Sequence, residues 1–169
     1  MKNFTQRQLV RCAMIAALYT AISLALAPLS YNAVQIRVAE ALCLLPVFVP
    51  DAIIGVTLGC LLTNLLGSTP IDAVFGTLAS LLAAMLTYRL RHVRWHGLPI
   101  ASAFSPVVCN AIIISAEITL FFSGGAGTAQ LFLLNAATVG LGEVISCVGL
   151  GLLLVKGIEK NPALRRAMA

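Results

Sequence analysis

Residues 31–50, YNAVQIRVAEALCLLPVFVP, are the stretch that decides how this chain folds. The helix expected here, residues 35–49, contains Pro46 and is too short to cross a membrane comfortably. Arg37 and Glu40 lie three residues apart, so both side chains share one helical face. Because the surrounding chain is very apolar, we expect these two charges to lie at the depth of the lipid, where they need polar partners.

The composition is that of a helical integral membrane protein. Of the 169 residues, 60% are hydrophobic and 10% are charged, whereas a soluble domain carries roughly 25% charged residues. The apolar runs are long and do not alternate, which favours membrane helices over strands. The net charge of +5 does not indicate nucleic-acid binding, because the basic residues gather at the ends of the expected spans. The five scattered cysteines form no CxxC pair, and we expect them to pack as small apolar residues.

We predict a single transmembrane domain, residues 1–169, folded as an all-α bundle of six spans. The first thirty residues resemble a signal peptide, but Pro28 directly follows the small residues, so we interpret the segment as a retained span. Asp51 is placed to cap the third helix, and the basic residues 156–169 form a tail. The expected helices cover about 9–28, 35–49, 52–67, 71–90, 99–122 and 129–155.

The distribution of Lys and Arg predicts how the bundle is oriented. If the N-terminus is cytoplasmic, ten of the eleven Lys and Arg residues lie on the cytoplasmic side, and the outer loops carry none. The eleventh is Arg37. By the positive-inside rule we expect both termini on the inner side of a bacterial plasma membrane.

The polar residues inside the expected spans fall mostly on the outer side of the midplane. An ionisable group at the bilayer centre costs about 2.5–3.5 kcal/mol, so these residues must face one another or a wet cavity. One arginine against four carboxyl groups favours a cationic ligand or one rich in N–H donors, since a carboxylate accepts two parallel N–H bonds. The candidate binding residues are Arg37, Glu40, Asn64, Asp72, Asn110, Glu117, Asn135 and Glu143.

Most of these residues also have a purely structural interpretation. Arg37 and Glu40 form an intrahelical pair in one interpretation, and the asparagines hydrogen-bond neighbouring helices in another. The sequence from Thr69 to Asp72 fits a helix cap with proline at the first position. Glu117 and Glu143 have no partner nearby in sequence, which favours a ligand or gating role.

The first predicted helix carries a row of small residues, the alanine row, which consists of Ala13, Ala17, Ala21 and Ala25. Their spacing of four places them on nearly one face, which either packs inside this chain or docks another membrane protein. No GxxxxGK[ST] occurs, so the chain has no P-loop for ATP, and no HExxH or Ser/His/Asp arrangement indicates an enzyme. We expect no metal and no cofactor.

Three stretches together resemble the QueT family of small membrane proteins. They are residues 7–67, residues 71–91 and residues 134–151, and the most specific part is QIRVAEALCLLP at 35–46. The resemblance implies the six-helix substrate-binding subunit of an energy-coupling-factor (ECF) transporter. It further implies a queuosine precursor as ligand, a 7-deazaguanine with a 7-aminomethyl or 7-cyano group. The implied partners are a membrane coupling subunit and two cytoplasmic ATPases.

The resemblance also suggests roles for individual residues. The alanine row would dock the coupling subunit, and the loop after the first helix, with Tyr31, Asn32 and Gln35, would help to close the outer site. Glu117 and Glu143 would accept the N–H edge or the amine of the ligand, while Arg37 and Glu40 would shape the mouth of the site and orient a base carbonyl. Two other functions stay open at this point: a stand-alone carrier driven by ions, and a scaffold subunit that binds no ligand.

Overall fold

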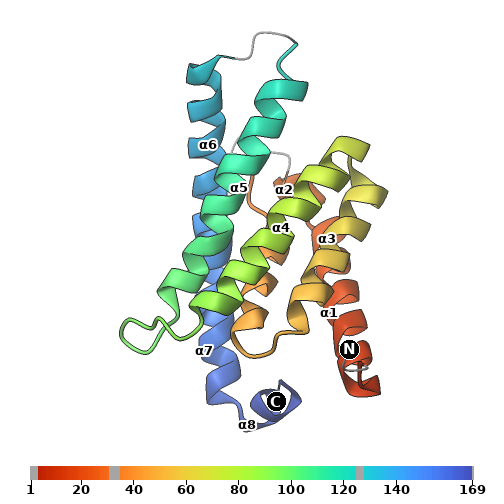
Figure 1. Ribbon diagram of the computed structural model, residues 1–169, viewed down its shortest axis with the longest axis vertical. Helices are drawn as coiled ribbons and strands as arrows, with labels where there is room; N and C mark the ends of the chain where they lie inside the picture. The colour runs from red at the N-terminus through yellow and green to blue at the C-terminus, as the bar shows by residue number, and fades with distance from the viewer. Residues whose placement is uncertain (1–3, 31–34, 125–127, 169) are drawn as a thin grey trace.

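The computed structural model describes residues 4–30, 35–124 and 128–168, and this part of the chain is helical (Figure 1). It contains no β-strand, only an isolated bridge between Trp95 and Leu98. The elements in chain order are α1 (Gln6–Ala25), α2 (Ala27–Ser30), η1 (Val38–Val47), α3 (Ala52–Gly67), α4 (Pro70–Leu90), α5 (Ile100–Phe121), α6 (Ala129–Glu143), η2 (Val144–Gly151), α7 (Leu152–Lys160) and α8 (Pro162–Ala167).

Four helical segments among the described residues are long and apolar enough to cross a membrane. These are α1, α4, α5 and the continuous segment Ala129–Lys160, which joins α6, η2 and α7. The predicted second and third spans are also helical, but η1 has 10 residues and α3 has 16. The fold is therefore that of a multi-pass membrane protein in which two of the apolar helices are short.

The second predicted helix is a 3₁₀-helix rather than an α-helix. It packs against η2, a π-helix that begins directly after Glu143. Pro46 has no N–H to donate within η1, and Gly151 of η2 leaves room for Leu44, whose methyl groups lie 3.1 and 3.2 Å from where a Cβ would stand. Long 3₁₀ runs and π-helices are both uncommon, and π-helices are frequent at functional sites.

Two glycines of α3 allow α1 to approach closely. A Cβ on Gly55 would lie 2.9 Å from Ile15 Cβ, and one on Gly59 would lie 2.7 Å from Tyr19 Cβ. The Arg11 guanidinium fixes the same pair of helices, because its Nε lies 2.7 Å and its Nη2 3.2 Å from the two Asp51 carboxylate oxygens.

The prediction that Asp51 is the N-cap residue of α3 is confirmed for its position but not for its side chain. Asp51 occupies the N-cap position, but its backbone is helical (φ −68°, ψ −20°) and its side chain makes no cap hydrogen bond. A capping side chain needs an extended backbone at that position. The carboxylate binds Arg11 instead.

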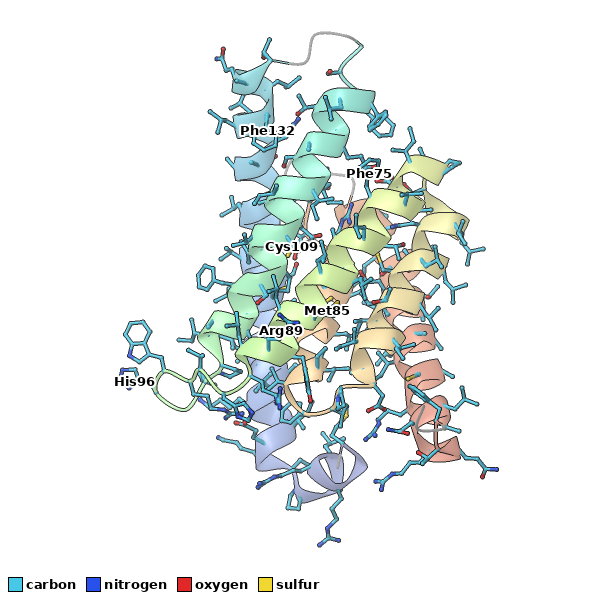
Figure 2. The ribbon with its side chains drawn as sticks, viewed as in Figure 1. Phe75, Met85, Arg89, His96, Cys109 and Phe132 are labelled. Carbon is cyan, nitrogen blue, oxygen red and sulfur yellow. The ribbon has the colours of Figure 1, made fainter. Side chains whose placement is uncertain are left out.

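Both chain ends lie at one end of the bundle, and the connections from α3 to α4 and from α5 to α6 lie at the other (Figure 1). Figure 2 shows Arg89 and His96 near the end that holds the termini, with Phe75 and Phe132 towards the opposite end. The C-terminal tail contains the short helix α8. Asn161 caps α8 there by accepting hydrogen bonds from the Ala163 and Leu164 N–H groups.

Candidate binding cavity

A cavity of about 300 Å³ lies at the end of the bundle away from the termini. Its wall is formed by the ends of α1, α3, α4 and α5 together with the segment that enters η1. The polar residues on this wall are Tyr19, Ser23, Gln35, Arg37, Thr63, Asn64, Ser68, Thr69 and Asp72. Four of the predicted binding residues, Gln35, Arg37, Asn64 and Asp72, therefore share one cavity.

Arg37 occupies the N-cap position of η1 and lies on the cavity wall. It interacts electrostatically with Glu40 and Glu143, and also with Glu117. Within the described residues, the ion pairs closer than 4 Å are those of Arg11 with Asp51 and of Arg94 with Glu159. Arg37 therefore lines the cavity and interacts with three glutamates, and it forms no ion pair closer than 4 Å within the described residues.

Glu40 lies behind the cavity wall and is fully buried. Its Oε1 accepts a hydrogen bond of 2.6 Å from the Tyr19 hydroxyl and one of 3.5 Å from Ser80, and its Oε2 accepts one of 2.9 Å from the Cys43 thiol. These donors come from α1, η1 and α4. The Glu40 carboxyl therefore joins three helices, and its charge helps to hold Arg37 in place.

Glu143 is also buried and does not line the cavity. Asn110 Nδ2 donates to its Oε1 over 2.8 Å, and the Cys147 thiol lies 3.3 Å from its Oε2. The same thiol lies 3.3 Å from the Glu40 backbone carbonyl. Asn110 and Glu143 thus link α5 to the start of η2, and both lie outside the wall of the cavity.

The cysteines do more than fill apolar space. All five are free and buried, yet the thiols of Cys43 and Cys147 contact the buried glutamates, and the Cys12 thiol lies 3.1 Å from the Asp51 carbonyl. The expectation that the cysteines pack as small apolar residues is confirmed, since all five belong to the buried core, and the thiol contacts come in addition because a thiol is also a weak donor.

Glu117 of α5 differs from the other two glutamates. Its side chain is fully buried, and neither carboxyl oxygen has a hydrogen-bond partner among the described residues. Asp72 is its nearest acidic neighbour and Arg37 its cationic one. Ile114 and Ile118, on either side of it along α5, line the cavity. A buried carboxyl group without partners is costly, so Glu117 lacks the compensation that Glu40 and Glu143 have.

Asp72 is held firmly at the start of α4. Its backbone N–H donates to Thr69 Oγ1 over 3.2 Å, which is the predicted N-cap. Ser68 Oγ bonds to its carboxylate Oδ2, and Asn64 Nδ2 donates to its backbone carbonyl over 2.9 Å. Asp72 therefore takes part in the helix cap through its N–H and also lies on the cavity wall. The structural and the binding interpretations of Asp72 are compatible.

The remaining predicted residues are divided. Gln35 lies on the cavity wall. Its backbone passes so close to Gly142 of α6 that a Cβ at Gly142 would clash with the Gln35 carbonyl oxygen. Asn135 Nδ2 donates to Thr119 Oγ1 over 3.1 Å and joins α6 to α5 away from the cavity. Tyr31 and Asn32 lie outside the described residues.

Sequence reasoning missed several residues of the wall. Tyr19 and Ser23 are one turn apart on α1, on a different face from the alanine row, and that periodicity was the available signal. Ser68 and Thr69 lie in the turn just before Asp72. Their hydroxyl groups could have been recognised in the sequence as candidate hydrogen-bond donors. The apolar part of the wall, including Ile114 and Phe122, carries no sequence signal that separates it from residues facing lipid.

The alanine row lies on the surface. Ala13, Ala17, Ala21 and Ala25 are all exposed, whereas Cys12, Ile15, Ala16 and Tyr19 form the buried face of α1. Packing of the row against another helix of this chain does not occur within the described residues. The row is free to meet lipid or another protein.

The fold and the cavity define a class: a small, helical, multi-pass membrane protein with a polar cavity between the ends of its helices. The sequence model of the QueT transporter family matches residues 9–160, and the chain belongs to this family. A protein of Lactococcus lactis subsp. cremoris described as "Queuosine precursor transporter QueT" is 31% identical over 154 residues, which are 86% of this chain and 89% of that protein. No solved structure matches the chain significantly. The resemblance inferred from the sequence is thereby confirmed at the level of the family, and the chain is a membrane transport protein.

Proposed function

We propose that this chain is the substrate-binding membrane subunit of an ECF importer and that it captures a queuosine precursor, a 7-deazaguanine such as 7-aminomethyl-7-deazaguanine. The observation that carries the proposal is a cavity walled by Arg37, Asn64 and Asp72 in a chain of the QueT transporter family. The volume of about 300 Å³ suits a bicyclic base, and ligand sites of this kind start near that size. The name of the Lactococcus relative points to the same ligand class.

The charges around the cavity support a ligand with an amine and a carbonyl. Asp72 lies on the wall with Glu117 next to it, so this side attracts N–H donors and cations. Arg37 supplies the complementary donor for a base carbonyl. In this proposal Glu40 and Glu143 act through Arg37, since both face it electrostatically and neither lines the cavity.

The proposed topology has six crossings with both termini in the cytoplasm. The four long helices would cross fully, and η1 and α3 would be short crossings. Nine described Lys and Arg residues, all except Arg37, lie on segments at the end of the bundle that holds the termini: Arg7, Arg11, Arg89, Arg91, Arg94, Lys156, Lys160, Arg165 and Arg166. By the positive-inside rule that end faces the cytoplasm, and the cavity faces outward.

The proposed partners are a membrane coupling subunit and two ATPases. The sequence has no P-loop, so energy from ATP would have to come from another chain. The exposed alanine row offers the close approach that small residues permit between membrane helices. We assign this row to the coupling subunit.

The proposal is tested by a thermal-shift screen of the purified full-length chain with 7-deazaguanines and ordinary purines. A ligand that binds the folded state raises the apparent melting temperature by mass action. We expect a concentration-dependent rise with 7-aminomethyl-7-deazaguanine and none with adenine. No rise with any 7-deazaguanine, confirmed by equilibrium dialysis, would contradict the proposal and favour a scaffold subunit.

A stand-alone carrier driven by ions is the second candidate, and Glu117 is the observation that favours it. Buried ionisable residues within membrane helices often belong to proton relays, and Glu117 is buried without a partner among the described residues. Uptake that continues in the presence of a protonophore, but stops when the partner ATPases cannot hydrolyse ATP, excludes this carrier. The opposite pattern excludes the ECF subunit.

A further inference from the structure

The side-chain amide of Asn64 is locked in one orientation. Its Nδ2 donates to the Asp72 carbonyl over 2.9 Å and lies 3.5 Å from the Cys60 sulfur. A backbone carbonyl only accepts hydrogen bonds, so the nitrogen of the amide must be the atom that faces it. The contact therefore determines which of the two amide atoms is left for the cavity.

The atom left over is Asn64 Oδ1. No donor within the described residues forms a hydrogen bond with this oxygen, and the oxygen is not fully buried. Because Asn64 lines the cavity, the oxygen is accessible from there. Asn64 therefore presents an acceptor, and no donor, to whatever occupies the cavity. An acceptor that is fixed before binding costs little entropy when the ligand arrives.

Gly76 of α4 makes this arrangement possible. A Cβ at Gly76 would lie 2.5 Å from Asn64 Nδ2, which is closer than a Cβ atom approaches such a neighbour in real structures. Any side chain at this position would push the amide out of place. Gly76 does not line the cavity, so it acts on a ligand only by way of Asn64.

A second acceptor stands beside the first. Asp72 lines the same cavity, and its carboxylate Oδ2 accepts a hydrogen bond from Ser68 Oγ. The backbone carbonyl of Asp72 accepts the hydrogen bond from Asn64 Nδ2. This bond fixes the position of the Asn64 side chain relative to Asp72. Two adjacent acceptors match two adjacent N–H donors, which in bicyclic bases is the pattern of a ring N–H next to an exocyclic amino group.

We propose that Asn64 Oδ1 and the Asp72 carboxylate together recognise the ring N–H and the 2-amino group of the base, so that the cavity selects bases of the guanine type over analogues without that amino group. This inference rests on the proposed function, whose ligand class it narrows. Arg37, at the start of η1, donates to the carbonyl of the same base. The 2-amino group is the discriminating feature, because a site that leaves a buried acceptor unpaired rejects the analogue that lacks the donor.

The test compares two ligands, 7-aminomethyl-7-deazaguanine and the same molecule without its 2-amino group, by isothermal titration calorimetry on the full chain in nanodiscs. For the wild type we expect a Kd about 10- to 100-fold lower for the amino compound. Asn64→Leu should remove most of this preference. Gly76→Ala should have the same effect, and the double variant should lose no more than either single one.

Two variants are matched controls. At Gly140 a Cβ would lie 3.6 Å from Ala111 Cβ, which is an ordinary contact, so Gly140→Ala should bind like the wild type. Thr57→Val removes a hydroxyl of α3 that donates to the Ile53 carbonyl within its own helix. It should also leave the preference unchanged.

The outcomes separate the two proposals. If the wild type binds both compounds equally well, the inference is overturned and the proposed function stands; this comparison needs no variant to fold. If Asn64→Leu and Gly76→Ala keep the full preference, another group recognises the amino group and the inference is equally overturned. If the wild type binds neither compound, the proposed function fails, and the inference fails with it.

Discussion

Glu117 of α5 lies next to Asp72 of α4 near the cavity, and the two carboxyl groups interact electrostatically. Glu40 and Glu143, one layer deeper, are each bonded to at least two donors. The acids are thus of two kinds, because neither carboxyl oxygen of Glu117 has a hydrogen-bond partner among the described residues. A cationic ligand would supply the hydrogen-bond donors and the opposite charge that a buried carboxyl group needs.

Glu117→Gln therefore tests whether Glu117 recognises the charge of the ligand or only contributes to the shape of the cavity. The amide keeps the volume but removes the carboxyl group, so we expect the affinity for 7-aminomethyl-7-deazaguanine to fall about tenfold. The affinity for the uncharged 7-cyano compound should change little, and thermal stability should not fall, because no hydrogen bond within the described residues is lost. Calorimetric titration of both ligands checks this.

Glu159→Gln is the matched control for that experiment, because Glu159 bonds to Arg94 at the opposite end of the bundle. It should bind both ligands like the wild type. Equal loss of both ligands in Glu117→Gln would mean that Glu117 shapes the cavity without recognising the amine.

Tyr19→Phe tests the role of Glu40 as a link between helices. The change removes the donor of the 2.6 Å bond to a fully buried carboxyl group, so we expect the free energy of unfolding to fall by about 1–3 kcal/mol. Chemical unfolding in detergent measures the difference. Tyr88→Phe is the control, since Tyr88 contacts Arg91 through its ring, and this variant should change stability by less than about 0.5 kcal/mol. A Tyr19→Phe variant as stable as wild type would show that the bond makes no net contribution.

The two ion pairs should differ strongly in their contribution to stability. The side chains of Arg11 and Asp51 are 13% and 3% exposed, whereas those of Arg94 and Glu159 are 37% and 31% exposed. Asp51→Asn leaves Arg11 without its carboxylate in a nearly dry site and should cost about 2–4 kcal/mol. Glu159→Gln should cost less than about 1 kcal/mol. Similar losses in both variants, measured by chemical unfolding, would contradict the assignment of Arg11 and Asp51 as the structural clamp between α1 and α3.

Ala17→Leu tests the proposed docking face. Ala17 is exposed in the middle of the alanine row, so leucine should hold a partner helix away without disturbing this chain. We expect co-purification with the coupling subunit to be lost while ligand binding by the isolated chain is kept. Val74→Leu, a change at another exposed position, should leave co-purification intact. If Ala17→Leu co-purifies normally, the docking face lies elsewhere.

Hydropathy and loop chemistry predicted the all-helical class of the chain and the position of two of its helices. The predicted helices 52–67 and 71–90 match α3 and α4 to within one residue at each end, because Thr69 with Pro70 is a strong start signal. Sequence did not reveal that residues 38–47 form a 3₁₀-helix or that a π-helix follows Glu143. Both depend on how η1 and η2 pack together, which a local pattern does not encode.

The candidate site was predictable in composition but not in layout. Counting residues along the helices correctly brought Arg37, Asn64 and Asp72 to one end of the bundle. It treated Glu117 and Glu143 alike, because neither has a local partner in sequence. The difference between them arises from Asn110 and Cys147, which reach Glu143 and not Glu117. Side-chain partners that come from a distant part of the chain are visible only in three dimensions.

The most direct test of the account is a calorimetric titration of the purified chain and its Asp72→Asn variant with 7-aminomethyl-7-deazaguanine. The account predicts one ligand per wild-type chain and an affinity about tenfold or more weaker in the variant, because Asp72 supplies the charged acceptor on the cavity wall. No binding by the wild type, or equal binding by both proteins, would contradict it.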